Sequence, residues 1–414
     1  MKQARTMRIS IITVLMGAFL LSACASPVRT AVPEALADQA RVPGFDEIRY
    51  WGDAAPPRIE TSAAENLEQI RRRYADRIAR GETVEIDFLA LSGGGGDGAF
   101  GAGLLNGWTK AGTRPEFQIV TGVSTGAIIA PLAFLGTGYD ADLKEAYTEI
   151  GPSDVYQAAI LPNMINGPAL ADTAPLRALV NRYATPQLMR DVAREHRKGR
   201  RLLVATTNLD AGRPVVWDLG AIAVSGRPDS LQLFRDVLLA SSAIPGLFPP
   251  VAIQVRANGE SYTELHADGG VTSQVFAYQP QVQLGQLLDA ADFAVSLDIY
   301  VIRNGRGLPD YDSPSPVWYR LTNRSLEILL SYQAMSDITR IYYLAQRDGF
   351  NFHLALIPET FKCDAAKPFQ QQYLRTLYDY GERLGEQGPP WLETPFEDVA
   401  SATGLAPPAC PDGK

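Results

Sequence analysis

Apolar residues recur along the chain at two different spacings, and the alternation of these spacings predicts an α/β fold. Short apolar runs predict strands at 84–91, 117–121, 201–207, 214–218, 293–302 and 352–357. Helical spacing predicts helices at 62–80, 99–111, 127–135, 317–346 and 366–385. Strands that alternate with helices form a mostly parallel central sheet with helices on both faces. No linker-like composition interrupts residues 84–357, so a single domain is expected.

Two of the predicted helices have a clear apolar side. In the helix at 62–80 this side is formed by residues four or three positions apart, and the helix ends at Gly81. In the helix at 317–346 the apolar side contains Leu326, Leu329, Leu330 and Tyr332.

The N-terminus has the pattern of an export signal. Lys2, Arg5 and Arg8 precede a 13-residue apolar run, from residue 9 to residue 21. A run of this length is shorter than the roughly 20 residues that span a bilayer, and it fits the core of a signal peptide. The run ends in Leu-Ser-Ala-Cys24, which resembles a bacterial lipobox. An ordinary signal peptide or a signal anchor with a chance cysteine is the alternative.

The lipobox resemblance implies cleavage before Cys24 and transfer of diacylglycerol to its thiol. A chain with such an anchor stays on the membrane stably. We expect a signal peptide at 1–23, a tether and irregular lead-in at 24–60, one folded domain at 61–390 and a C-terminal tail at 391–414. The expected location is the bacterial cell envelope, facing the periplasm. No aspartate follows Cys24, which by analogy favours the outer membrane.

Charge and cysteine content exclude several classes of protein. The net charge of −8 argues against nucleic acid as a partner, because phosphate binding needs a basic face. The chain has three histidines, too few with its cysteines for a zinc site, and no metal or other cofactor is expected. Beyond Cys24 only Cys363 and Cys410 remain, and an oxidising periplasm would allow them to form a disulfide.

A serine lies in a glycine-rich turn between a predicted strand and a predicted helix. The motif is Gly122-Val-Ser124-Thr-Gly126. A strand-to-helix turn of this kind lifts a serine hydroxyl out of the sheet, and flanking glycines let the backbone fold sharply. The motif therefore predicts Ser124 as a nucleophile, although a G-x-S-x-G pattern also occurs in ordinary turns.

A second glycine-rich segment follows the strand at 84–91. Gly93, Gly94, Gly95 and Gly96 precede Asp97 and Gly98 at the start of a predicted helix, where exposed backbone N–H groups can hold an anion. Residues 96–101 also match the G-x-G-x-x-G dinucleotide pattern. The next strand, however, ends at the serine motif and not at an acidic residue, and no Lys-Ser or Lys-Thr completes a phosphate loop. An oxyanion hole is the favoured interpretation.

The third motif is Asp268-Gly269-Gly270, which follows a predicted strand. The glycines let the aspartate approach a serine hydroxyl closely, although Asp-Gly also forms plain turns.

The order of glycine-rich loop, serine turn and Asp-Gly-Gly resembles the patatin-like phospholipase family. A further match is the segment from Ala240 to Val251, Ala-Ser-Ser-Ala-Ile-Pro-Gly-Leu-Phe-Pro-Pro-Val. The resemblance covers residues 84–275 and implies a three-layer patatin-like fold. It also implies a Ser124–Asp268 dyad, an oxyanion hole in the loop 93–98, and hydrolysis of acyl esters in phospholipids or related lipids.

The chain departs from the family pattern at two places. Asp97 stands where the family usually has arginine or lysine, and residues 271–274 replace a frequent Asn-Pro pair. The first departure suggests neutral glycerides or esters as substrates, or a phosphate bound elsewhere.

Two other functions compete with a dyad hydrolase. The order Ser124, Asp268, His353 fits a Ser-His-Asp esterase, although His353 lies inside a predicted strand and His266 is more typical of a structural residue. The second competitor is a lipid-binding envelope lipoprotein that has lost catalysis.

Overall fold

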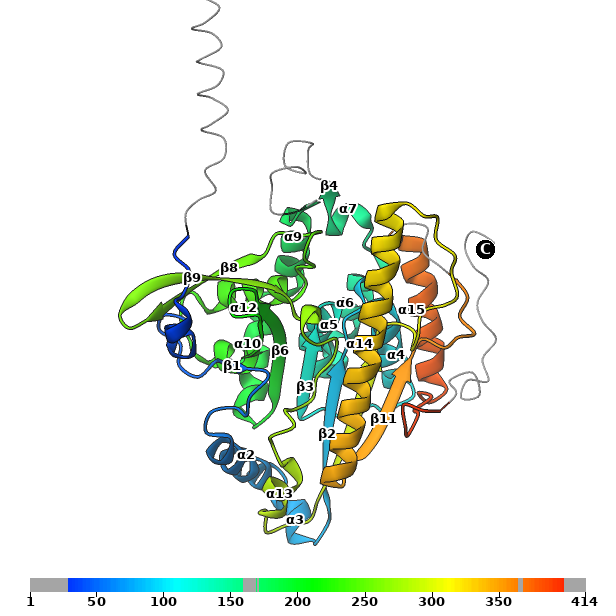
Figure 1. Cartoon of the computed structure of the whole chain (residues 1–414). Coiled ribbons are helices and arrows are strands. Elements are labelled where there is room, and N and C mark those ends of the chain that lie inside the picture. Colours follow the sequence, from blue (N-terminus) through cyan, green and yellow to red (C-terminus); the bar gives the residue numbers. More distant parts are fainter. Residues whose placement is uncertain (1–28, 159–168, 170, 364–367, 398–414) are drawn as a thin grey trace, which may run out of the picture.

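The computed structural model describes residues 29–158, 169, 171–363 and 368–397 of the 414-residue chain. The predicted signal peptide, Cys24, Cys410 and most of the predicted tail lie outside the described residues. A mixed α/β structure forms around a mostly parallel central sheet (Figure 1), so the predicted fold class is confirmed.

The main sheet has the strand order β1-β7-β6-β3-β2-β10-β11, and a β8–β9 hairpin joins it through β6. Strands β6, β3, β2, β10 and β11 are parallel neighbours, whereas β1, β7 and β9 pair antiparallel. The strands are β1 (Arg49–Trp51), β2 (Val84–Leu91), β3 (Ile119–Val123), β4 (Gln157–Ala158), β5 (Ala171–Asp172), β6 (Arg201–Asn208), β7 (Arg213–Asp218), β8 (Val251–Ala257), β9 (Glu260–Asp268), β10 (Val295–Arg303) and β11 (Asn351–Leu356).

Helices cover both faces of this sheet. The α-helices are α2 (Ile59–Arg73), α3 (Ala75–Ala79), α4 (Gly98–Lys110), α5 (Thr125–Leu135), α6 (Asp140–Thr148), α7 (Pro152–Val155), α9 (Ala174–Tyr183), α10 (Pro186–Arg197), α11 (Leu219–Val224), α12 (Ser230–Ser241), α13 (Leu284–Asp289), α14 (Trp318–Asp348) and α15 (Gln371–Glu386). Short 3-10 helices are η1 (Glu34–Gln39), η2 (Gly95–Asp97), η3 (Gly136–Tyr139) and η4 (Gly269–Val271).

The two-residue period of β2 separates the core into two layers. Leu89 and Leu91 join the larger apolar cluster with α4, α5 and α15, whereas Ile86 and Phe88 join a smaller cluster with α14. Because successive side chains of a strand point to opposite faces, one apolar strand supplies both layers. Figure 1 shows α14 crossing the sheet on the face of the smaller cluster.

Most predicted elements agree with the structure, and two details differ. The helix predicted at 62–80 is interrupted at Tyr74 and forms α2 and α3. In α14, the residues predicted on an apolar side are exposed: Leu326, Leu329, Leu330 and Tyr332. The sequence pattern predicts an apolar side of the helix, but it does not show which surroundings that side contacts.

Helices α4 and α15 pack unusually close through glycines. A Cβ on Gly103 would lie 2.1 Å from the Tyr378 carbonyl oxygen, and one on Gly107 would lie 2.0 Å from that of Glu382. On the facing helix, Gly381 is similarly tight against the Phe100 carbonyl, at 2.5 Å. Backbone atoms cannot yield as a flexible side chain can, so this contact fixes α4, whose N-terminus follows the glycine-rich loop.

Replacing Gly103 with alanine is expected to lower the free energy of unfolding by roughly 2–3 kcal/mol, because the added methyl overpacks a backbone contact. Urea unfolding measures the change. Gly138→Ala is the matched control, since its Cβ would meet no atom within 4 Å. Equal stability of the two variants would contradict the close-packing argument.

Candidate active site

Ser124 lies in the sharp turn between β3 and α5. Its backbone has φ 53° and ψ −122°, a conformation that non-glycine residues rarely adopt. A Cβ at Gly126 would lie 2.4 Å from the carbonyl oxygen of Leu91, at the end of neighbouring β2. The turn therefore closes against the next strand, and it holds Ser124 at the carboxyl edge of the parallel sheet.

The structure brings Ser124 and Asp268 into direct contact. The Ser124 hydroxyl donates to Oδ2 of Asp268 at 2.7 Å, and the Gly270 N–H donates to Oδ1 at 2.7 Å. Asp268 is the last residue of β9, which pairs with β6 at Thr206. Both side chains are buried, with exposed fractions of 7% for Ser124 and 5% for Asp268. A hydroxyl and a carboxylate in this arrangement can exchange a proton.

Burial controls the proton affinity of Asp268. Loss of solvent raises the pKa of its carboxyl to about 7, while hydrogen bonds from Ser124 and from the Gly270 N–H act in the opposite direction. Near neutral pH, therefore, the carboxylate is a stronger base than an exposed aspartate.

The glycine-rich loop lies beside this pair. A Cβ on Gly93 would lie 3.3 Å from the Ser124 Cβ. The N–H of Gly93 donates to the Gln274 carbonyl at 2.9 Å and is occupied, whereas within the described chain no hydrogen-bond acceptor is found for the N–H groups of Gly94, Gly95 and Gly96. Gly94 permits the loop path, because a Cβ there would lie 1.8 Å from the Asn304 carbonyl oxygen.

Arg303 and Asn304 support this loop from behind. The guanidinium of Arg303 donates to the Gly93 carbonyl at 2.9 Å, and the Asn304 amide donates to the Ser92 carbonyl at 2.8 Å. Among the described residues Arg303 forms no ion pair, although the charges of Asp97 and Asp337 favour its protonated form. Burial lowers its pKa to about 10, so the side chain stays protonated at neutral pH. A buried cation thus holds the loop through its backbone.

Replacing Arg303 with methionine is expected to lower kcat roughly 10- to 100-fold while KM changes little, because the loop loses its fixed geometry. Ester hydrolysis measures this split, and Arg303→Lys should restore part of kcat. Arg235→Met is the control, since Arg235 also donates to a backbone carbonyl, that of Ala184. An unchanged kcat in Arg303→Met would exclude the positioning role.

The two departures from the family pattern have defined contacts. Asp97 accepts a hydrogen bond from the Tyr373 hydroxyl of α15 at 2.7 Å. In the segment 271–274, Gln274 donates to the Gly270 carbonyl at 2.8 Å, and its own N–H donates to Asp337 of α14 at 2.7 Å. Gln274 thus joins the glycine-rich loop, the Asp268 turn and α14.

The three histidines have partners away from Ser124 and Asp268. His353 contacts Asp298 at 2.7 Å, and fully buried His266 contacts Thr206 and Glu264 at 2.9 and 3.0 Å. His196 lies 3.6 Å from Asp218. All three are within the described ranges, and none forms a hydrogen bond with the serine–aspartate pair.

The cysteines and acidic residues give no further site. Cys363 is buried and takes part in a disulfide, but its predicted partner Cys410 lies outside the described residues, so the pairing stays a prediction. Within the described ranges, no three His, Cys, Asp or Glu side chains come together as metal ligands would.

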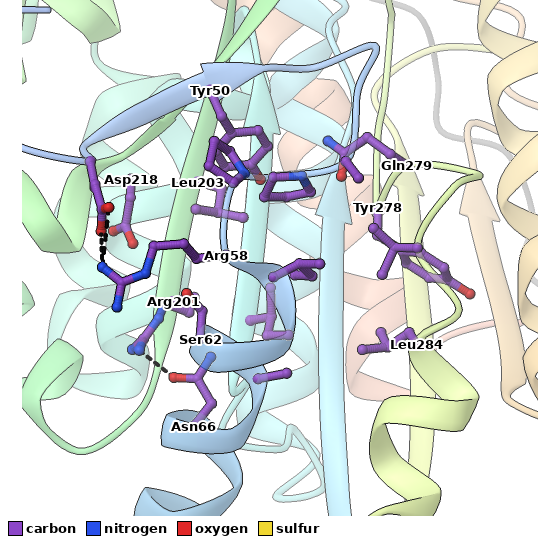
Figure 2. Close-up of a pocket in the computed structure, with 18 of the residues that line it drawn as sticks. Tyr50, Arg58, Ser62, Asn66, Arg201, Leu203, Asp218, Tyr278, Gln279 and Leu284 are labelled. Carbon is purple, nitrogen blue, oxygen red and sulfur yellow. Dashed lines mark hydrogen bonds and ion pairs between the residues drawn. The ribbon is translucent and has the colours of Figure 1, made fainter.

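A large cavity of about 1080 Å³ lies apart from the serine–aspartate pair. Figure 2 shows it between α2 and α13, with Asn66 and Arg201 joined by a hydrogen bond at one side. Its floor includes Phe88 and Leu203 from the sheet. Neither Ser124 nor Asp268 lines this cavity, so we do not assign it to the chemistry of the pair.

Sequence reasoning did not assign Ser241 a contact, although it lies in the quoted segment 240–251. Its hydroxyl accepts the Ser124 N–H at 3.0 Å and donates to the Ala205 carbonyl at 2.7 Å. Arg303, Asn304 and Asp337 were also missed. The signal for Arg303 and Asn304 was their place at the end of a parallel strand.

Comparison with known proteins identifies a family for the central part of the chain. Residues 89–279 match the model of the family described as patatin-like phospholipase. A search of curated proteins found no match. Among solved structures, the crystal structure of VipD from Legionella pneumophila aligns at 13% identity over 73% of this chain and 66% of that chain, with a TM-score of 0.34, too low to carry an argument. The family match confirms the resemblance: the chain contains a patatin-like phospholipase domain.

Proposed function

We propose that the chain is a serine acyl hydrolase that cleaves ester-linked acyl chains of phospholipids or related lipids, with Ser124 as nucleophile and Asp268 as base. The observation that carries the proposal is the 2.7 Å hydrogen bond from the Ser124 hydroxyl to Asp268, inside a patatin-like phospholipase domain. The family supports lipid acyl hydrolysis in general. The dyad and the substrate class are our proposal.

The geometry supports a two-step acyl transfer. Asp268 accepts the Ser124 proton as Oγ attacks the ester carbonyl carbon, and that proton then passes to the alcohol as the C–O bond breaks. Water next attacks the acyl-serine and gives a proton to Asp268, which returns it to Ser124. The fatty acid leaves, and no group is oxidised or reduced.

The oxyanion formed in both steps needs hydrogen-bond donors. We assign this role to Gly94, Gly95 and Gly96, whose N–H groups have no acceptor among the described residues. Gly93 is removed from the predicted donors because Gln274 occupies its N–H. One such donor contributes about 3–4 kcal/mol to transition-state binding.

The value of kcat/KM is expected to rise with pH and to level off with an apparent pKa near 7, because only the ionised Asp268 accepts the serine proton. Hydrolysis of a soluble ester between pH 5 and 9 measures the profile. His353→Gln should leave it unchanged, since His353 pairs with Asp298. A profile that is flat across pH 7, or that falls there, would contradict the assignment of the base.

We also propose that the mature chain is anchored in the bacterial envelope through Cys24 and faces the periplasm. The lipobox-like sequence supports this. Mass spectrometry of the mature N-terminus should show a diacylated cysteine, and an unmodified residue there would oppose the anchor.

Fatty-acid release from vesicles of mixed phospholipid and diacylglycerol tests the activity. We expect release that depends on the folded protein, and the lipid that is consumed identifies the preferred head group. If a folded protein binds the vesicles but neither releases fatty acid nor reacts with a fluorophosphonate, the lipid-binding alternative holds instead.

A further inference from the structure

The first half of α14 exposes large apolar side chains to solvent. The exposed fraction is 77% for Trp318, 64% for Leu329 and 57% for Tyr332. The first buried residue of the helix is Ala334. Four turns therefore extend beyond the core, and Figure 1 shows this yellow end of α14 at the top of the molecule.

Several of these exposed side chains share one sector of the helix. At about 100° per residue, Trp318, Leu321, Leu329 and Tyr332 fall within a sector roughly 80° wide, and we call this sector the apolar side. Arg320 and Glu327 fall on the opposite side, and Arg324 lies about 100° from the centre of the sector.

Of the polar residues in this segment, Arg324 is partly buried. Its side chain is 16% exposed and donates to Glu327 and to the Asp310 carbonyl, whereas Glu327 is 55% exposed. An ordinary surface helix turns its apolar side chains toward the protein, so a helix that leaves large apolar side chains in water is the reverse of that pattern. Such a surface marks a contact with another apolar phase.

Topology places this helix at the edge of the sheet that carries Ser124. Strands β6, β3, β2 and β10 are parallel neighbours, so their carboxyl ends share one edge. Ser124 directly follows β3, and α14 begins 15 residues after the end of β10. The carboxyl ends of β3 and β10, which have β2 between them, lie roughly 10 Å apart across the sheet, at twice the ordinary spacing of strands.

The N-terminal part of the chain reaches the same edge. Arg29, the first described residue, forms an ion pair with Asp210, which lies two residues beyond the carboxyl end of β6. Cys24 precedes Arg29 by five residues, at most roughly 18 Å of chain. A lipid anchor at Cys24 would therefore hold this edge close to a membrane.

Other exposed apolar residues lie on the same side. Leu209 follows β6, and Val271 follows the Asp268 turn.

Helix α14 is also linked to the site, because Asp337 of α14 accepts the Gln274 N–H and the Ser273 hydroxyl, at 2.7 and 3.0 Å.

We propose that residues 318–333 form an interfacial helix that inserts its apolar side into a phospholipid bilayer and turns the Ser124 edge toward the membrane. The proposal rests on the proposed function, because it delivers the nucleophile to acyl esters of that bilayer. Tryptophan and tyrosine are the side chains that settle at a membrane surface. Among the described helices none is long and apolar enough to cross a bilayer.

Depth-dependent quenching of Trp318 tests the insertion. The full chain with Ser124→Ala, which prevents hydrolysis, is mixed with phosphatidylcholine vesicles that contain brominated acyl chains. The signal of Trp318 is taken as the difference from Trp318→Phe in the same background. We expect about half of this signal or more to be quenched. Leu321→Glu/Leu329→Glu should abolish the quenching, and Tyr343→Glu/Phe396→Glu, at exposed positions away from the edge, should not.

The activity of the same two double variants, with Ser124 intact, separates membrane docking from ester hydrolysis. For Leu321→Glu/Leu329→Glu we expect hydrolysis of vesicle lipid to fall about 10-fold or more, while hydrolysis of a soluble short-chain ester changes less than about 2-fold. Quenching without hydrolysis of either substrate would support docking and reject the proposed function. An unquenched Trp318, or a dimer that shields it in place of vesicles, would overturn the proposal.

Discussion

Replacing Ser124 with alanine is expected to lower kcat for ester hydrolysis by roughly 10⁴- to 10⁶-fold, because no other hydroxyl takes its place at Asp268. Folding should survive the change. Alanine carries the same Cβ as serine at φ 53°, so the backbone strain is unchanged, and one buried hydrogen bond is lost at about 1 kcal/mol. Steady-state hydrolysis and urea unfolding measure both effects.

Ser336→Ala is the matched control for the serine replacement. Ser336 is exposed on α14 and donates to the Tyr332 carbonyl within the same helix. Its kcat should stay within about twofold of the parent value. Residual activity of Ser124→Ala above a few per cent of the parent would mean that another residue is the nucleophile.

Replacing Asp268 with asparagine is expected to lower kcat roughly 10³- to 10⁴-fold, because an amide cannot accept the serine proton. Asparagine Oδ1 can still accept the Gly270 N–H, so the turn is preserved. The double variant with Ser124→Ala should be no slower than Ser124→Ala by itself, since the two residues act in one step. Additive losses in the double variant would indicate separate roles.

The same replacement should stabilise the fold at alkaline pH. Burial raises the pKa of Asp268 to about 7 in the native state, so the native chain binds an extra proton between about pH 4 and 7. The stabilisation linked to that proton is full at low pH and is lost as pH rises through 7. Asparagine carries no charge to desolvate. Above pH 8, the free energy of unfolding of Asp268→Asn should therefore exceed that of the parent by a few kcal/mol.

Urea unfolding of the parent and of Asp268→Asn at pH 5 and pH 8.5 measures this difference. The comparison is made between variants, because other carboxylates titrate in the opposite sense. Glu264, for instance, has its pKa lowered to about 2: burial raises it, but His266 and Arg49 outweigh that effect. A variant that is less stable than the parent at pH 8.5 would contradict the buried-charge argument.

The sequence predicted the parts of the site that local backbone geometry specifies. A strand, a glycine turn and a helix can be recognised around Ser124 because each has a short-range pattern. The Asp-Gly-Gly turn after β9 could be recognised for the same reason. The separation of 144 residues between Ser124 and Asp268 could not be bridged by pattern. Their proximity was implied by family resemblance and then found in the structure.

The rest depended on contacts between distant segments. Arg303 contacts the Gly93 carbonyl 210 residues away, and neither residue has a local feature that names the other. The exposure of α14 was missed for a related reason. A periodic apolar side predicts that a helix has a partner, but it does not distinguish a protein core from a membrane. Only the burial of α14, which begins at Ala334, and the contact of Asp337 with the Gln274 N–H showed which part of the helix faces the protein.

The reaction of the purified chain with a fluorophosphonate, followed by mass spectrometry of the peptide that contains Ser124, tests whether Ser124 is the nucleophile and Asp268 its base. We expect a single adduct on Ser124 in the parent and labelling slowed on the order of 100-fold or more in Asp268→Asn. A folded parent protein that remains unlabelled, or that is labelled at another serine, would contradict a Ser124–Asp268 acyl hydrolase.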